Sequence, residues 1–422
     1  MYKNIDNRPP FAAFTDKHPK EGFASLPSPC YIIDEGQLHQ NGQLLASLTE
    51  RTGCKILLAQ KAFSNYDFYP LLAEYLSGTE ASGLFEAKLG KEKMPGKEVH
   101  VFCGAYRKEE MEELLTVADH IVFNSPYQLK KFGPPAKQAG KSLGLRINPE
   151  CSTQKGHEIY DPCAPGSRLG TTLKLWEQEM TEELIGLLDG LHFHTLCEQD
   201  SDALELTLKA VEEKFGFILP RMKWLNMGGG HHITRPGYDL KRLEDCIKKA
   251  QENWDLQVYL EPGEACALNA GFLVTRVLDV VQSGNYRVAI LDASAACHMP
   301  DVIEMPYTPP LYGASEAETR PGIAITGAST SETEAGSTEY IYRLTGPTCL
   351  AGDIIGDYTF CQPLKEGDML IFGDMAIYTT CKNNTFNGMP LPNIWKRDIE
   401  GNLKQLTCFG YKDFKTRLGS PE

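Results

Sequence analysis

Short apolar, β-prone runs alternate with longer amphipathic segments between residues 55 and 260. The runs lie at Lys55–Leu58, Thr79–Ser82, Val99–Phe102, His120–Phe123, Leu143–Ile147, Leu191–His194, Lys223–Met227 and Gln257–Leu260. Helical spacing of apolar residues predicts helices between most of these runs, at Met111–Ala118, Ser125–Lys137, Met180–Leu188, Ala203–Phe215 and Leu240–Asn253. Eight strands separated by helices predict a closed (β/α)8 barrel rather than an open, doubly wound sheet.

The pattern differs on either side of this region. Residues 1–27 contain four prolines and predict a loosely held arm, which Cys30–Asp34 and Gln37–Arg51 follow as a strand and a helix. After residue 269 the runs are β-rich without a long helical segment, at Leu273–Gln282, Tyr286–Asp292, Tyr340–Leu344, Met369–Phe372 and Ile377–Thr380. The expected division is therefore an arm (1–27), a barrel (28–269) and an all-β domain (270–422) with an exposed, acidic loop at 314–338.

The composition narrows the class of partner. With 42 Lys and Arg residues against 56 Asp and Glu residues, the formal charge is −14, which disfavours nucleic acid and anionic membranes and leaves small cations as partners. The 13 scattered cysteines form no C-x-x-C pair and predict free thiols in a reducing cytoplasm. The polar start of the chain predicts no signal peptide, and no apolar run has the length of a membrane-spanning helix.

Lys61 lies three residues after the first barrel run, in the stretch KILLAQKAFS. The simplest interpretation of a lysine just past a strand is a solvated surface residue. The second is an amine in a dry pocket, where desolvation lowers the pKa of the ammonium and lets the amine attack a carbonyl group. Chemically active residue types also follow other runs, at Asn148, His194, Gly228 to Gly230 and Glu261. Barrel active sites are built at the carboxyl ends of strands, so this distribution favours the second interpretation.

Gly228, Gly229 and Gly230 follow the seventh run. Glycine lets backbone N–H groups approach a phosphate closely, and the helix-prone sequence after Pro236 would favour an anion at its amino end. The alternative is a tight turn without a ligand. The spacing does not match the G-x-G-x-x-G of a dinucleotide site, so NAD is not expected.

Glu261 follows the eighth run, in Glu-Pro-Gly-Glu. A carboxylate here can hydrogen-bond the pyridine nitrogen of pyridoxal phosphate and keep it protonated, which makes the cofactor a strong electron sink. Without Lys61, a solvated glutamate at an ordinary strand–turn junction would be the preferred interpretation.

His192 and His194 share one strand face, since side chains alternate along a strand. They could bind a metal, as in barrel hydrolases that use H-x-H, with His231 and His232 as the close candidates for further ligands. The other interpretation is a histidine stacked on a flat cofactor ring. We expect no metal at this motif, because no Asp or His cluster completes a ligand set.

Cys349 lies in a Gly- and Pro-rich turn, GPTCLAGD, with Asp353 close by. Most of the cysteines are expected to be inert. In this turn Cys349 is either structural or a proton donor.

Together these segments resemble the fold-type III pyridoxal-phosphate decarboxylases, the alanine racemase-like group that contains ornithine, arginine and diaminopimelate decarboxylases. The resemblance extends from about Pro27 to Phe414. The matching segments are QKAFS, FNSPYQL, LRINP, SRLG, HFHTLCE, MGGG, LEPGEA, TCLAGD, FNG near Gly388 and FGYKDFK. Within the group, the details are most similar to the members that act on carboxylated polyamines.

The resemblance implies pyridoxal 5'-phosphate as the cofactor, attached to Lys61. It implies that His194 stacks on the cofactor ring and that Glu261 contacts the pyridine nitrogen. Gly228 to Gly230 and Tyr378 would contact the phosphate.

The implied reaction is decarboxylation of an α-amino acid with an aminopropyl polyamine tail, a step of spermidine biosynthesis. Cys349 would come from the partner subunit of a head-to-tail homodimer and protonate the α-carbon. We expect Glu264 and Asp301 to bind the cationic tail, and Asp353 to hold a substrate amine or orient Cys349.

Two positions depart from the group. It usually reads E-P-G-R where this chain has Glu264, and it often has an acidic residue where this chain has Leu350. The first change inverts a charge near the site, and the second leaves the pose of the substrate amine open.

Other functions stay open at this stage. Another decarboxylase of the same fold, of the diaminopimelate, ornithine or arginine type, would use the same residues. A racemase would share Lys61 but typically pairs the pyridine nitrogen with arginine, so Glu261 counts against it. A metal-dependent barrel hydrolase would use His192 and His194. A non-catalytic carrier of the cofactor would leave the β domain and Cys349 unexplained.

Overall fold

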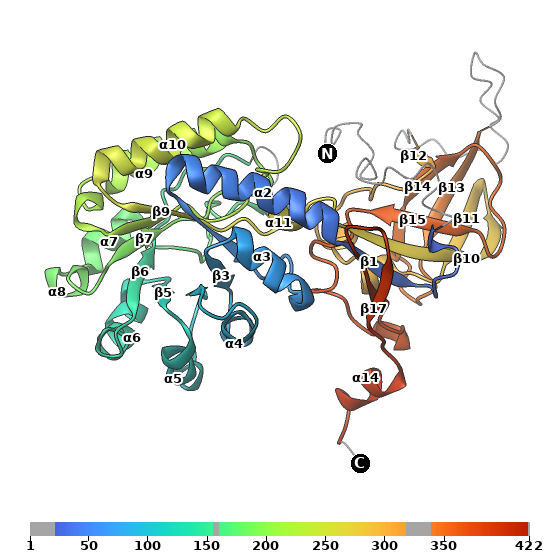
Figure 1. Ribbon diagram of the computed structural model, residues 1–422, viewed down its shortest axis with the longest axis horizontal. Helices are drawn as coiled ribbons and strands as arrows, with labels where there is room; N and C mark the ends of the chain where they lie inside the picture. The colour runs from blue at the N-terminus through green and yellow to red at the C-terminus, as the bar shows by residue number, and fades with distance from the viewer. Residues whose placement is uncertain (1–21, 155–159, 318–338, 421–422) are drawn as a thin grey trace. The chain divides into compact units, whose positions relative to one another are not determined.

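The computed structural model describes residues 22–154, 160–317 and 339–420. It divides into two compact units (Figure 1). His39–Cys266 forms one unit, and the described residues on either side of it form the other.

The first unit is a closed barrel of eight parallel strands, as the sequence predicts. The strands are β2 (Lys55–Ala59), β3 (Gly78–Ala81), β4 (Glu98–Phe102), β5 (His120–Phe123), β6 (Ser142–Arg146), β7 (Gly190–His192), β8 (Trp224–Asn226) and β9 (Gln257–Leu260). Each strand pairs with the next along the chain, and β2 closes the ring on β9 through Lys55↔Tyr259 and Ile56↔Leu260. Because all strands run the same way, their carboxyl ends meet at one mouth of the barrel.

Helices cover the outside of the barrel (Figure 1). They are α2 (Glu35–Thr52), α3 (Tyr69–Tyr75), α4 (Leu84–Lys93), α5 (Lys108–Val117), α6 (Pro126–Gln138), α7 (Leu173–Glu179), α8 (Glu182–Ile185), α9 (Ser201–Phe215), α10 (Leu240–Trp254) and α11 (Glu264–Ala267), with short 3-10 turns at Tyr66–Phe68 and Leu219–Arg221. The helix expected at Met180–Leu188 is only the single turn α8, which Thr181 caps and Gly186 ends. The other four helices expected between the runs are present with shifted ends.

Side-chain volume inside the barrel is balanced across neighbouring strands. Trp224 packs with Leu57, Val122 and Tyr259 in a buried cluster. A methyl group on Gly190 of the adjacent strand would lie 2.0 Å from the Trp224 ring, so only glycine leaves room for the indole.

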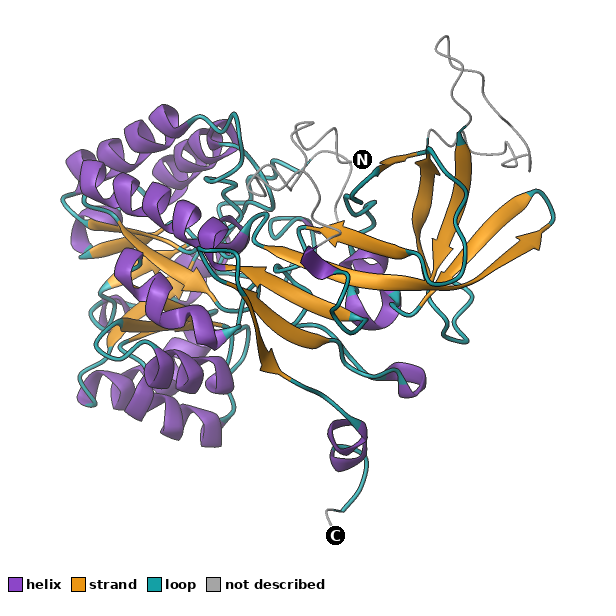
Figure 2. Cartoon of the chain, turned by 45° about the vertical axis from the view of Figure 1, so that its right-hand side comes forward, coloured by secondary structure: helices purple, strands orange, loops and turns teal. Residues whose placement is uncertain are grey.

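The second unit is built on a sheet of nine strands (Figure 2). They are β1 (Cys30–Asp34), β10 (Gly271–Ser283), β11 (Tyr286–Leu291), β12 (Ala314–Glu316), β13 (Tyr340–Thr345), β14 (Ile354–Phe360), β15 (Met369–Gly373), β16 (Asn393–Arg397) and β17 (Leu403–Thr407). The order is β12-β14-β13-β11-β10-β1-β16-β17, and β15 pairs with β10. Short helices lie between the strands and at the end of the chain, as α12 (Ala295–His298), α13 (Asp301–Glu304), the 3-10 turn Phe386–Gly388 and α14 (Tyr411–Thr416).

The start of the chain belongs to this second unit, which corrects the barrel range drawn from residue 28. The strand β1 is buried along its whole length and pairs with β10 and β16. Its last residue, Asp34, is buried and accepts a 2.9 Å hydrogen bond from Arg397, its register partner on β16. Phe23 and Leu26 pack into the same core, so this end of the expected loose arm is held by apolar contacts. Residues 1–21 lie outside the described residues.

Two further expectations for this unit are wrong. The run at Ile377–Thr380 is a series of bends, because Tyr378 has a φ of 48° and leaves the extended conformation. The loop expected from residue 314 begins with the strand β12, which pairs with β14. The rest of that loop, residues 318–338, lies outside the described residues.

Candidate active site

Glu261 directly follows β9 at the carboxyl mouth of the barrel and is almost fully buried. One carboxylate oxygen accepts a 2.5 Å hydrogen bond from the amide of Asn226, and the other lies 3.0 Å from Nε2 of His192. Burial raises the pKa of Glu261, but the charge and hydrogen bond of His192 and the Asn226 amide outweigh it, and the net pKa is lowered. The buried side chain is therefore an oriented carboxylate.

His194 lies at the same mouth of the barrel, just beyond the end of β7. Its Nδ1 accepts a 2.8 Å hydrogen bond from the N–H of Gly229. Burial, followed by the nearby charges of Lys61 and Arg146, holds the pKa of His194 well below its usual range. The ring is therefore neutral at neutral pH and suited to stacking on a flat partner.

The three glycines after β8 are required by close backbone contacts. A methyl group on Gly229 would lie 2.3 Å from the carbonyl oxygen of Glu261, and one on Gly230 would lie 2.1 Å from that of Leu196. Gly228 and Gly230 also have left-handed φ values of 70° and 80°. The N–H of Gly228 donates to Asn226 and that of Gly229 to His194, whereas in the described part of the chain the N–H of Gly230 has no acceptor. Gly230 is thus the available backbone donor for a phosphate.

Lys61 lies in the turn after β2 and is exposed. In the single chain this exposure agrees with the first of the two interpretations, a solvated lysine, and not with the dry pocket. Its charge still acts on the site, since it lowers the pKa of His194 and opposes the raised pKa of Glu80. The lysine is therefore within electrostatic reach of the same mouth of the barrel.

Three polar residues of this mouth were not singled out from the sequence. Asn226 orients Glu261. Arg146 ends β6, donates to the carbonyl of His194 at 2.9 Å, and has a pKa lowered to about 10 by burial. Glu80 near the end of β3 is buried, and burial and the charge of Glu261 raise its pKa well above its usual range. Their position at strand ends is the signal that could have found them.

His192 and Asn148, two further polar residues at the strand ends, bind other groups of the protein. His192 is bound to Glu261 and stacks on Phe102 with ring centroids 5.4 Å apart, so the H-x-H motif is engaged by protein groups. The side chain of Asn148 donates to Leu169 and accepts from the N–H of Glu150, which shapes a loop.

Glu264 begins the short helix α11 and pairs with His232. Nε2 of His232 lies 3.1 Å from the Glu264 carboxylate, and Glu198 offers a third ligand-type oxygen within 4.8 Å. Burial opposes protonation of His232, but its bond to Glu264 and the charges of Glu264 and Glu198 raise its pKa. The carboxylates of Glu264 and Glu198 thus lie close to His232.

In the second unit, Asp353 organises the turn that carries Cys349. Its buried carboxylate accepts hydrogen bonds from the hydroxyls of Ser294, at 3.0 and 2.9 Å, and Thr348, at 2.6 Å. The exposed Cys349 donates its backbone N–H to Asn387 at 3.0 Å. These contacts favour the orienting role for Asp353 over direct contact with a substrate amine.

Asp301 and Tyr378, also in the second unit, both lie near Lys382. Asp301 forms an ion pair with Lys382, so its charge is partly compensated within the chain. The Lys382 ammonium lies 6.0 Å from the centroid of the Tyr378 ring. The left-handed backbone of Tyr378 is a strained conformation that proteins mostly keep where a side chain must point in one direction.

The family of the chain follows from its sequence as well as from this site. The family model described as "Pyridoxal-dependent decarboxylase, C-terminal sheet domain" matches residues 30–376. The chain therefore belongs to the pyridoxal-dependent decarboxylases, as the motifs implied. The neutral His194 ring, the oriented Glu261 carboxylate and the open N–H of Gly230 fit pyridoxal phosphate.

Within the family, the three relatives that are 34–43% identical to this chain are named for carboxylated polyamines, and relatives at 23–25% identity are named diaminopimelate decarboxylase. The carboxynorspermidine/carboxyspermidine decarboxylase of Campylobacter jejuni is 43% identical over 395 residues, which cover 94% of this chain and 99% of that protein. The carboxyaminopropylagmatine decarboxylase of Synechocystis sp. is 40% identical over 397 residues, covering 94% and 96%. The crystal structure of the C. jejuni carboxynorspermidine decarboxylase complexed with norspermidine has a TM-score of 0.82 at 42% identity, covering 93% of this chain and 100% of that one.

The cysteines and the hydropathy of the helices also agree with what the composition predicts. The 13 cysteines all lie in the described part of the chain and form no disulfide there, as their spacing predicted. In the described part of the chain, no helix combines the length and the apolar character that crossing a membrane requires.

Proposed function

We propose that this chain decarboxylates carboxynorspermidine and carboxyspermidine to norspermidine and spermidine. The supporting observation is the 43% identity to the C. jejuni enzyme of that name along nearly the whole of both chains. The reaction, pyridoxal-dependent decarboxylation, follows from membership of the family. The substrate is inferred from the name of the C. jejuni relative.

When bound, pyridoxal phosphate supplies the electron sink that lets an α-amino acid lose carbon dioxide. Lys61 would hold the cofactor covalently, and its exposure on the single chain leaves the amine accessible to it. Glu261 would keep a proton on the pyridine nitrogen, since His192 and Asn226 orient the carboxylate and keep it ionised. His194 would lie flat against the ring, and the N–H of Gly230 would bind the phosphate.

Tyr378 and Cys349 are the residues that the second unit would contribute. Tyr378 would bind the phosphate. Cys349 would donate a proton to the α-carbon from the partner subunit of a homodimer, with Asp353 holding its turn in place. The free cysteines support a cytoplasmic location for this enzyme.

The preference for a cationic tail rests on charge. Glu264 and Glu198 lie close together at the mouth of the barrel, and a pair of carboxylates attracts an ammonium group and repels a second carboxylate. Two unit charges about 4 Å apart interact by roughly 4 kcal/mol at an effective dielectric of about 20, before desolvation is subtracted. A fraction of that energy disfavours diaminopimelate by about tenfold or more. Asp301 is the weaker candidate for the tail, because its charge is already partly compensated by Lys382.

A second substrate is favoured by a specific observation, the 40% identity to a carboxyaminopropylagmatine decarboxylase. That substrate ends in a guanidinium group rather than an amine, and a carboxylate pair can bind either cation. The two candidates share the reaction and differ only in the end of the tail.

An assay with purified enzyme and added pyridoxal phosphate tests the proposal. Carboxynorspermidine, carboxyspermidine, carboxyaminopropylagmatine, diaminopimelate, ornithine and lysine are compared by release of carbon dioxide. We expect the first two to have the highest kcat/KM, and ornithine and lysine to be weak because their tails are too short. A preference for diaminopimelate would overturn the substrate assignment while leaving the family membership intact.

A further inference from the structure

We propose that Glu98, His100 and His120 form a binding site for a divalent transition-metal ion, with zinc preferred, at the amino end of the barrel strands. This site lies at the opposite end of the strands from the candidate active site. The inference therefore does not depend on the proposed function.

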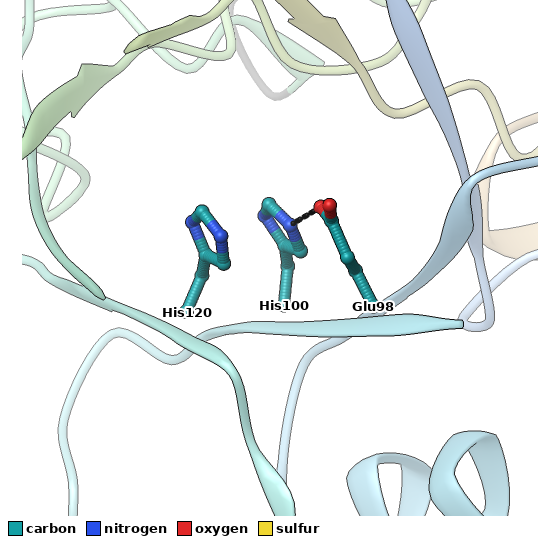
Figure 3. Close-up of side chains that lie close together, drawn as sticks. All are labelled: Glu98, His100 and His120. Carbon is teal, nitrogen blue, oxygen red and sulfur yellow. Dashed lines mark hydrogen bonds and ion pairs between the residues drawn. The ribbon is translucent and has the colours of Figure 1, made fainter. Parts of the chain in front are cut away.

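The three side chains are brought together by strand register. Glu98 and His100 lie two residues apart on β4 and so point to the same face, and His120 is the register partner of His100 on β5. Figure 3 shows the three side chains projecting to the same side of these strands. One potential ligand atom from each residue lies within 4.8 Å of the others.

The spacing suits a small metal ion. Nε2 of His100 lies 3.0 Å from a carboxylate oxygen of Glu98, and the two imidazole rings are 3.9 Å apart and nearly parallel. Ligands at about 2.0–2.1 Å around a tetrahedral zinc ion are separated by about 3.4 Å. Because the rings are stacked, His120 must turn out of the stack to direct a nitrogen lone pair at an ion held by His100 and Glu98; the three side chains then form a His2Glu set with a fourth position for water.

The protein alone does not satisfy these rings. His100 is 1% exposed, and in the described structure its buried Nδ1 and that of His120 have no hydrogen-bond partner. Buried polar groups are normally paired, so the unpaired Nδ1 of His120 is a ligand atom without a partner in the described chain, while His100 offers Nε2, the nitrogen that faces Glu98. A neutral imidazole binds a metal through its unprotonated nitrogen, so zinc at Nε2 of His100 requires the ring proton to be on Nδ1, and no proton is lost from the neutral ring.

The ammonium of Lys55 competes with a metal ion for the carboxylate of Glu98. Its ammonium lies 2.5 Å from the other carboxylate oxygen of Glu98 and 3.4 Å from the hydroxyl of Tyr259. The Lys55 side chain is 37% exposed, so it can turn into solvent when a metal ion takes its place. Removing its charge should strengthen metal binding, and this gives the site a specific signature.

The experiment measures zinc binding by the holoenzyme after dialysis against a chelator. Wild type, His120→Gln and Lys55→Met are titrated with zinc chloride in competition with a chromophoric chelator. We expect Lys55→Met to bind about tenfold more tightly than wild type, and His120→Gln to lose about one equivalent. In wild type, but not in His120→Gln, saturating zinc should raise the melting temperature by about 5 °C.

The second histidine cluster and the cysteines provide the controls. His232→Gln removes the histidine beside Glu264 and should bind zinc as wild type does. X-ray absorption of the zinc-loaded Lys55→Met protein should show nitrogen and oxygen ligands with imidazole scattering, which keeps the test valid if His120→Gln does not fold. Equal stoichiometry and affinity in wild type and His120→Gln, or zinc bound through sulfur, would overturn the proposal.

Discussion

At the scale of single residues, the site depends on how burial and neighbouring charges set protonation. Glu261 stays ionised because His192 and Asn226 outweigh the cost of burying it, while burial and the charge of Glu261 raise the pKa of Glu80. Lys61, His194 and Glu261 could be proposed from the sequence because they lie at or just after the carboxyl ends of apolar runs. Arg146 also ends a predicted strand, but the sequence gives no sign that its side chain is buried, so its place in the site needed the structure.

Glu261→Gln tests the role of this carboxylate. The amide keeps the shape of the side chain but not its charge, so it cannot hold a proton on a pyridine nitrogen. We expect kcat to fall by roughly 10²-fold with the circular dichroism spectrum unchanged. Glu244→Gln, which breaks a surface ion pair with Arg51, is the matched control and should have normal activity. Activity of Glu261→Gln within twofold of wild type would rule out this role.

The pair formed by Glu264 and His232 predicts a pH dependence of stability. The pKa of His232 is raised in the folded chain, so its stabilising effect is complete below the unfolded pKa of about 6.5 and is lost as the pH rises through the folded value. Glu264→Gln should therefore lower the free energy of unfolding by about 2 kcal/mol at about pH 6, and by less at about pH 9.

Urea unfolding of wild type and Glu264→Gln at both pH values measures this difference. In a His232→Gln background the substitution should have nearly the same effect at each pH, because the titrating partner is gone. A difference between wild type and Glu264→Gln that grows with pH would contradict the assigned pair.

At the scale of elements, local sequence patterns correctly predict the barrel strands. The assignment of β1 to the barrel was wrong because it depends on pairing between distant parts of the chain. The eight barrel strands were found because each is a short apolar run between amphipathic helices. The strand β1 has the same appearance but pairs with β10 and β16, which lie far along the chain, and no local pattern reveals such partners. Tyr378 lies in an apolar run that fails to form a strand because its backbone is left-handed.

Gly229→Ala tests the turn after β8 as a structural unit. The new methyl group would lie 2.3 Å from the carbonyl oxygen of Glu261, so either the turn or the glutamate must move. We expect a loss of about 1–3 kcal/mol of stability, and weaker retention of pyridoxal phosphate after dialysis. Absorbance of the released cofactor and thermal unfolding measure both. Gly104→Ala is the control, because nothing lies within 4 Å of its added methyl group, and equal cofactor content in the two variants would contradict the expectation.

At the scale of the whole molecule, the residues proposed for the chemistry belong to two units. The barrel carries Lys61, His194 and Glu261, and the sheet unit carries Cys349 and Tyr378. The sequence predicted two domains, because the repeating pattern of strands and helices ends near residue 269. It could not show that residues before the barrel complete the sheet unit, since this depends on pairing between the two ends of the chain.

Mixing two inactive variants tests the sharing of sites across a homodimer. Lys61→Ala and Cys349→Ala each lack one group in every site, but one of the two sites in a mixed dimer has both. After subunit exchange we expect about a quarter of the wild-type activity, because about half of the dimers are mixed and each has one complete site. Native mass spectrometry confirms exchange, and mixed dimers as inactive as either parent would contradict site sharing.

Competition between substrates in one reaction tests the proposed function most directly. Equimolar carboxynorspermidine, carboxyaminopropylagmatine and diaminopimelate are incubated with the enzyme and pyridoxal phosphate, and the decarboxylated products are counted by mass spectrometry at low conversion. The product ratio then equals the ratio of the kcat/KM values. We expect norspermidine to dominate by about tenfold or more, with no product from Lys61→Ala. An excess of aminopropylagmatine or lysine over norspermidine would contradict the assignment.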